Sequence, residues 1–271
     1  MRKIFLFPLA MALCACQSDP ALDGSSIEER VTLTFTPYDV EPLTRTATSI
    51  SNYCSHLDVW LTDGTTTTAV HQSSGDSGFG TLSVTLDKTK TYTLYAVAHK
   101  CASDATLSDG VISFPDDKVT HSMFYTTTFS PATTTNVNAL MNRIVADFRL
   151  EITDDIPTDA VKFRFTVNGV YDRWNVSTGG THQLDRVSTI NYNGTSAVFN
   201  VYAIVTDAQT THDITVTALD ENDQEVQTRT FVDVPLRNGY KTNYRGQFFT
   251  DAAFTSTFTA EDWNEYDTVD F

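Results

Sequence analysis

Hydrophobic and polar residues alternate along most of the chain, which is the pattern of β-strands that bury one face in a core. Residues 31–35 place Val, Leu and Phe on one face and Thr on the other. Similar runs cover 57–61, 82–86, 91–98 and 111–114, and polar or Gly-containing turns separate them. No stretch of about ten or more residues has the 3.6-residue period of a helix. The pattern therefore predicts an all-β fold.

The second half of the chain repeats the same alternation after a Thr-rich tract at 126–138. We place a domain junction near residue 141. Two tandem β-sandwiches of about seven strands each fit the number of runs and the length. The predicted division is an N-terminal sandwich over 27–140 and a C-terminal sandwich with a terminal strand over 141–271. The runs of the second half are 144–150, 161–167, 197–205, 213–219, 227–232 and 241–249.

The first residues are set aside before any reasoning about the fold. Arg2 and Lys3 precede an apolar run at 4–12, which is shorter than the roughly 20 residues that span a membrane. The run ends in Leu13-Cys14-Ala15-Cys16, which resembles a bacterial lipobox. That resemblance implies a lipoprotein signal peptide over 1–15, lipidation of Cys16, and a lipid-anchored chain whose tether covers 16–26. An ordinary secretory signal with two incidental cysteines is the alternative.

Composition and charge narrow the class of function. The 271 residues carry 18 Lys and Arg against 34 Asp and Glu, a formal net charge of -16. This acidic balance excludes a nucleic-acid binder, because phosphate binding needs basic patches. It also argues against a basic membrane-surface protein. Hydrophobic residues make up 41%, which is enough for a sizeable core.

Two cysteines remain in the folded part once Cys14 and Cys16 are assigned to the signal and the lipid. Cys54 and Cys101 each lie just outside a strand-like run. Export makes a disulfide between them chemically feasible, and it would add a few kcal/mol. Two separate buried thiols are the alternative.

We find no motif for catalysis, a cofactor or a metal, so the chain is not expected to be an enzyme. The six histidines show no pair at metal-ligand spacing, and no Gly-x-Ser-x-Gly or His-Glu-x-x-His is present. The acidic run at 220–225 lacks the spacing of a Ca²⁺ loop and is better explained as a hairpin turn. Tyr171 and Trp174 could stack on sugars, but core or interface packing is the more frequent role of such aromatics.

Several pieces in order resemble the fimbrillin superfamily of Bacteroidales, specifically its FimB/Mfa2 family of major and minor fimbria anchors. The resemblance covers essentially the whole mature chain. It rests on the lipobox at Cys16, the first strand at 31–35, Leu43-Thr44-Arg45-Thr46-Ala47, the strand at 57–61, Asn142-Arg143-Ile144-Val145-Ala146 and Leu236-Arg237-Asn238-Gly239-Tyr240-Lys241-Thr242 leading to Tyr244-Arg245-Gly246.

The resemblance implies two transthyretin-like β-sandwiches, no catalysis and no small-molecule substrate. It implies an outer-membrane, surface-exposed fimbrial anchor or accessory subunit, whose partners are other fimbrial subunits joined by β-strand complementation. A non-fimbrial adhesin or carbohydrate-binding surface lipoprotein is the alternative. The short final segment leaves the role within the fimbria open.

Two segments are candidates for assembly. Fimbrillins are cut after an Arg that follows the first strand, and Arg45 lies at such a place; a surface Arg in a turn is the favoured alternative, since an anchor keeps its N-terminus. The end of the chain stays apolar at Phe254, Phe258, Trp263 and Phe271. It is a candidate donor strand for a neighbouring subunit, or a strand of its own domain.

Overall fold

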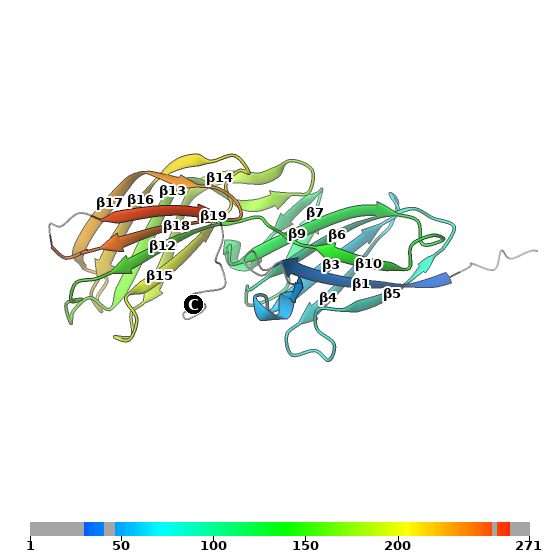
Figure 1. Ribbon diagram of the computed structural model, residues 1–271, viewed down its shortest axis with the longest axis horizontal. Coiled ribbons are helices and arrows are strands. Elements are labelled where there is room, and N and C mark those ends of the chain that lie inside the picture. Colours follow the sequence, from blue (N-terminus) through cyan, green and yellow to red (C-terminus); the bar gives the residue numbers. More distant parts are fainter. Residues whose placement is uncertain (1–29, 41–46, 251–253, 261–271) are drawn as a thin grey trace, which may run out of the picture.

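The computed structural model describes residues 30–40, 47–250 and 254–260, and these are mostly β-strands (Figure 1). Two short 3-10 turns, η1 (Ile50–Asn52) and η2 (Pro115–Asp117), are the helical elements within these ranges. The predicted all-β fold is confirmed. Among the described residues, no helix has the length and apolar character needed to cross a membrane.

The first sandwich is built from two sheets. One sheet places β1 between β10 on one side and β5 and β2 on the other, and the second has the order β11-β9-β6-β3-β4. The strands are β1 (Arg30–Val40), β2 (Ala47–Ser49), β3 (His56–Thr62), β4 (Thr67–Ser73), β5 (Leu82–Asp87), β6 (Tyr92–His99), β9 (Ser122–Phe129), β10 (Asn136–Leu140) and β11 (Asn142–Arg143).

The core of the first sandwich lies between these two sheets. Leu33 and Phe35 of β1 have no exposed surface and pack in one cluster with residues of the facing sheet, among them Leu57 and Leu94. The alternation of apolar and Thr residues in β1 therefore has the predicted explanation: the apolar side chains enter the core, and the Thr side chains point away from it. β1 runs parallel to β10 and antiparallel to β5, so it is an internal strand of its sheet.

The second sandwich also has two sheets. One has the order β15-β12-β18-β19, and the other has the order β17-β16-β13-β8-β7 with β14 paired to β13. The strands are β7 (Thr106–Ser108), β8 (Val111–Ser113), β12 (Ala146–Ile152), β13 (Lys162–Asn175), β14 (Gly179–Asn191), β15 (Val198–Ala203), β16 (Thr210–Leu219), β17 (Glu225–Leu236), β18 (Tyr240–Gly246) and β19 (Thr255–Ala260). A cluster rich in Phe, including Phe148, Phe163, Phe165 and Phe199, fills the space between the sheets.

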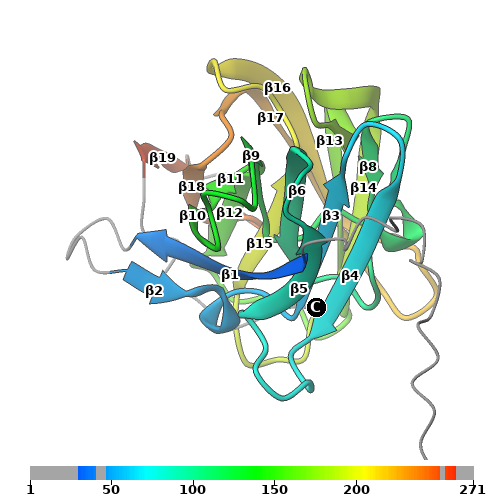
Figure 2. The same cartoon turned by 90° about the vertical axis from the view of Figure 1, so that its right-hand side faces the viewer.

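The two sandwiches lie end to end (Figures 1 and 2) and share a third apolar cluster. Trp60 and Phe124 reach this cluster from the first sandwich, and Trp174 and Ile204 reach it from the second. The β7–β8 hairpin comes from the first half of the sequence, but β8 pairs with β13. The division at residue 141 remains a prediction, and the hairpin shows that strand pairing crosses it.

Candidate functional site

Four of the residues singled out from the sequence lie outside the described residues: Cys16, Arg45, Trp263 and Phe271. Arg45 falls in the segment 41–46 that joins β1 to β2. Phe258 belongs to β19, of which the structure describes the backbone at that position. The proposed lipidation and processing of the chain therefore stay predictions.

Cys54 and Cys101 are both buried, and the structure contains no bridge between them, which was one of the two alternatives left open by the sequence. Cys54 belongs to the core of the first sandwich, whereas Cys101 belongs to the cluster between the sandwiches. The Sγ of Cys101 donates to the carbonyl of Lys118 at 3.3 Å. The two cysteines thus match the alternative of two separate buried thiols.

The terminal strand β19 pairs with β18 of the same chain, with Ala260 opposite Tyr240 and Thr255 opposite Arg245. Phe254, the first candidate donor residue, packs edge-on against Phe231 with ring centroids 4.9 Å apart. The structure thus places this strand in its own domain, one of the two alternatives that the sequence left open. Within the described residues β19 has one hydrogen-bonded neighbour, so it forms the edge of its sheet.

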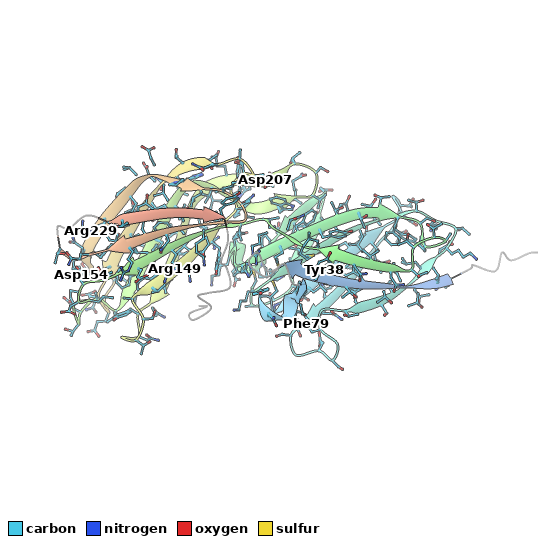
Figure 3. All side chains as sticks on the ribbon, in the orientation of Figure 1. Tyr38, Phe79, Arg149, Asp154, Asp207 and Arg229 are labelled. Atoms are coloured by element: carbon cyan, nitrogen blue, oxygen red, sulfur yellow. The ribbon has the colours of Figure 1, made fainter. Side chains whose placement is uncertain are left out.

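Two polar side chains at the far end of the second sandwich hold residues 248–250, which follow β18 (Figure 3). The carboxylate of Asp154 accepts hydrogen bonds from the backbone N–H groups of Phe248, Phe249 and Thr250 at 2.8, 2.8 and 3.1 Å. The guanidinium of Arg229 donates to the carbonyls of Phe248 and Thr250. These bonds satisfy the backbone groups of residues 248–250, which lie outside the strands, and so hold this part of the chain in place.

Gly246 allows the close approach of Phe254 to the end of β18. A Cβ at position 246 would lie 2.8 Å from the Cδ1 atom of Phe254 and 2.9 Å from its Cα atom. The backbone contact means that rotation of the ring would not relieve the clash. The Tyr244-Arg245-Gly246 run of the sequence thus ends where β19 folds back.

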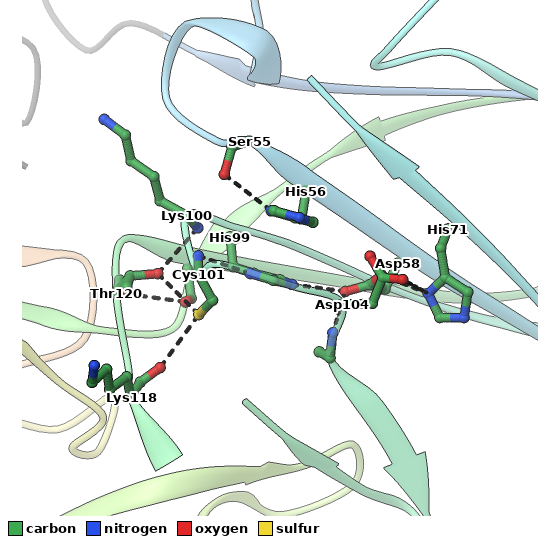
Figure 4. A network of polar contacts seen from close by, with 12 residues as sticks. Ser55, His56, Asp58, His71, His99, Lys100, Cys101, Asp104, Lys118 and Thr120 are labelled. Atoms are coloured by element: carbon green, nitrogen blue, oxygen red, sulfur yellow. Dashed lines mark hydrogen bonds and ion pairs between the residues drawn. The ribbon is translucent and has the colours of Figure 1, made fainter. Parts of the chain in front are cut away.

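A polar network centred on Asp58 links three strands of the first sandwich (Figure 4). Asp58 is fully buried, and both of its carboxylate oxygens accept hydrogen bonds. The Oδ1 atom accepts from His71 Nδ1 at 2.6 Å. The Oδ2 atom accepts from His99 Nε2 at 2.7 Å and from the backbone N–H of Ala105 at 2.9 Å. Burial alone would raise the pKa of Asp58, but these three hydrogen bonds together hold it below its ordinary value. The carboxylate is therefore ionised at neutral pH.

Two kinds of chemistry can be considered for this network. Asp58, His71 and Asp104 offer ligand atoms within 4.8 Å of one another and could hold a metal ion. A metal there would have to replace the 2.6 Å hydrogen bond between Asp58 and His71. Cys101, His99 and Asp58 are the residue types of a thiol triad, but Cys101 is 5% exposed and its Sγ is engaged by a carbonyl. The geometry favours a structural role.

A cavity of about 250 Å³ opens between the outer edges of β14 and β15, beside the junction of the sandwiches. Residues 187–190 of β14 and 200–202 of β15 form its walls, and Lys100, Lys118 and Arg186 bring positive charge to it. Arg186 is 7% exposed, and two of its nitrogens donate to the carbonyls of Asp117 and Val119 at 3.1 and 2.9 Å. These basic groups lie together in a chain whose formal net charge is -16.

Reasoning from the sequence missed both the Asp58 network and this cavity. Asp58 interrupts an apolar run, and a carboxylate within a buried strand normally has a partner, so one signal was available. The partners come from β4 and β6 through strand register, which local spacing does not reveal. Trp174 and Tyr171, considered as sugar-binding aromatics, instead pack in or against the cluster between the sandwiches.

No family model and no curated protein matches the chain. Among solved structures, a candidate adhesin from Bacteroides ovatus matches at a TM-score of 0.51 and 14% identity, covering 86% of this chain and 98% of its own. A candidate polysaccharide-binding protein from Bacteroides thetaiotaomicron matches at 0.51 and 9% identity, covering 80% and 92%. These matches establish a shared fold. The fimbrial anchor protein Mfa2 from Porphyromonas gingivalis matches at 0.46 and 11% identity, covering 80% and 90%, too weakly for any conclusion.

Proposed function

We propose that the chain is a lipid-anchored structural subunit of a surface fimbria, an anchor or accessory subunit that joins other subunits by β-strand complementation. The observation that carries the proposal is the position of β1. This strand comes from the start of the described chain, yet it occupies the interior of a sheet between β10 and β5. Its connection to β2 runs through the segment that contains Arg45.

An internal strand at the start of the described residues is suited to exchange. Without β1, the backbone groups of β10 and β5 would lose their partners, and the pocket for Leu33 and Phe35 would open to water. A strand from another chain could supply both the hydrogen bonds and the apolar side chains. The edge strand β19 offers a second place at which another chain could add a strand.

The shared fold with a candidate adhesin supports a role at the cell surface. It equally supports the second candidate function, a non-fimbrial adhesin or carbohydrate-binding lipoprotein, and the likeness to a candidate polysaccharide-binding protein favours that alternative. Both functions are structural rather than catalytic. They differ in whether strand edges or loops and cavities make the contact with the partner.

Expression of the full chain in a Bacteroidales host, with an alkyne analogue of palmitate, tests the proposal. We expect label on the chain in the outer-membrane fraction and its loss in Cys16→Ala, whereas Cys54→Ala keeps the label. Other fimbrial subunits should co-purify with the labelled chain. Mass spectrometry of the N-terminus then distinguishes an anchor from a processed subunit. A chain that begins at Cys16 keeps β1, as an anchor would, whereas a chain that begins at Thr46 has lost β1. Label without co-purifying subunits, together with binding to a glycan array, would overturn the fimbrial role in favour of the adhesin.

A further inference from the structure

The cavity between β14 and β15 lies at an open side of the second sandwich. β14 pairs with β13, and β15 pairs with β12; among the described residues neither has a strand on its outer side. Sandwiches commonly cover such edges, because unpaired backbone groups and the apolar residues between the sheets otherwise face water. The cavity is therefore a place where a further segment of polypeptide fits.

The polar groups of this cavity favour a negatively charged segment. Arg186 is buried, yet none of the described carboxylates forms an ion pair with it, and its Nε has no hydrogen-bond partner among them. The Oδ1 of Asn200 is likewise buried without a described partner. Lys118 is exposed at the rim of the cavity. The charge of Asp172 acts on Arg186 without an ion pair between the two side chains. A carboxylate in direct contact would offset more of the cost of burying the guanidinium.

The chain itself contains a segment with the matching chemistry. Residues 261–271 carry five acidic residues and no Lys or Arg. Trp263, Tyr266, Val269 and Phe271 alternate with them and could cover the apolar part of the lining. The segment thus combines the charge and the apolar groups that the cavity lacks.

The strand register brings this segment within reach of the cavity. Thr259, Lys241, Asp147 and Tyr202 form one row across β19, β18, β12 and β15, and Tyr202 lines the cavity. Three strand spacings amount to about 14 Å. Eleven extended residues span about 36 Å, so the segment that follows Ala260 can cross the row and still lie along the cavity.

We propose that residues 261–271 bind in the β14–β15 cavity of their own chain, with their carboxylates paired to Arg186 and Lys118. The segment then covers the open side of the second sandwich and adds to the contact between the two sandwiches, since Lys118 belongs to the first half of the sequence. This inference rests on the cavity and on charge, and does not depend on the proposed fimbrial function.

Disulfide trapping in the full chain tests the inference. Val187 lines the cavity and is 59% exposed, while Val232 is 64% exposed on β17 and serves as the matched control. We expect Val187→Cys with Val269→Cys to form an intramolecular bridge at least about tenfold faster than Val232→Cys with Val269→Cys. Adding Lys118→Glu should slow the bridge severalfold, whereas Lys88→Glu, at the far end of the first sandwich, should leave its rate unchanged.

The results of this experiment distinguish between three occupants of the cavity: residues 261–271 of the same chain, a second copy of the chain, and a sugar acid. A monomeric bridge whose rate is independent of protein concentration supports binding within the chain. A bridge found only in dimers would show that a second copy fills the cavity and would overturn the proposal. Equal rates for the two cysteine pairs would also overturn it. The proposal fails as well if sodium glucuronate binds equally to the full chain and to a chain ending at Ala260, because the cavity would then be a site for sugar acids.

Discussion

Replacement of β1 by a strand from outside tests how the first sandwich is completed. A chain that begins at Thr46 lacks β1 and therefore lacks Leu33 and Phe35, which are both fully buried. We expect this chain to bind a synthetic peptide of residues 30–40, since the peptide restores the ladders to β10 and β5. Binding of the peptide should also protect the truncated chain from proteolysis.

The side chain of Phe35 sets the size of the effect. Truncating a buried Phe to Ala costs about 3–5 kcal/mol, and each 1.4 kcal/mol changes an equilibrium constant tenfold. A Phe35→Ala peptide should therefore bind at least about a hundredfold more weakly. Thr32 lies on the exposed face of the same strand, so a Thr32→Ala peptide should bind within about twofold of the original.

Fluorescence anisotropy of a labelled peptide measures these affinities. Equal binding of the Phe35→Ala and Thr32→Ala peptides would refute the reasoning, because the groove would then not recognise the apolar face of β1. The same pair can be measured in the full chain by urea unfolding, which does not require the truncated chain to fold. There, Phe35→Ala should lose about 3–5 kcal/mol and Thr32→Ala less than about 0.5 kcal/mol.

Three further predictions concern polar side chains. Burial lowers the pKa of His121 to about 3, whereas in the unfolded chain it titrates near 6.5. The unfolded state thus binds the proton first, and His121 by itself lowers the free energy of unfolding by about 2 kcal/mol from about pH 7.5 to about pH 5. His99, whose hydrogen bond to Asp58 outweighs burial and raises its pKa to about 9, and Asp147, whose burial raises its pKa to about 7, act in the opposite direction. The test is therefore the difference in urea unfolding between the wild-type chain and His121→Phe, which should change by about 2 kcal/mol between these two pH values. Asp58→Ala should lower the free energy of unfolding in urea by about 3–5 kcal/mol, because it leaves the buried His99 without its partner. His71 is half-exposed, so His71→Ala should lower it by less than about 1 kcal/mol. Equal losses for the two variants would contradict the central role of Asp58 in the network. Asp154→Ala should speed hydrogen exchange of the β19 amides severalfold, with the exposed Asp155→Ala as a control that leaves exchange unchanged.

Alternation in the sequence was sufficient to predict most of the strands. The run at 31–35 became β1 and the run at 57–61 became β3 because each has one set of side chains in a core between sheets. Periodicity of two residues reports such burial directly. It does not report which strand lies beside which, so the pairing of β8 with β13 could not be predicted from the sequence.

The candidate sites were harder to predict for the same reason. Asp58 meets His71 through the register of β3 with β4, and it meets His99 through the fold of β6 beside β3. Arg186 meets the carbonyls of Asp117 and Val119 across about seventy residues of sequence. Each site is assembled by non-local pairing, whereas motifs such as a lipobox are local and can be recognised in the sequence alone.

The position of β1 also has a mechanical consequence. A pull at Arg30 along the axis of β1 acts across the ladders to β10 and β5. The hydrogen bonds to the antiparallel β5 lie perpendicular to the strands, and those to the parallel β10 are slanted. Such a load strains all the bonds of both ladders in shear at the same moment, instead of opening them one pair at a time. A chain held at its start would therefore resist drag at the point where the force enters β1, the first strand that the structure describes.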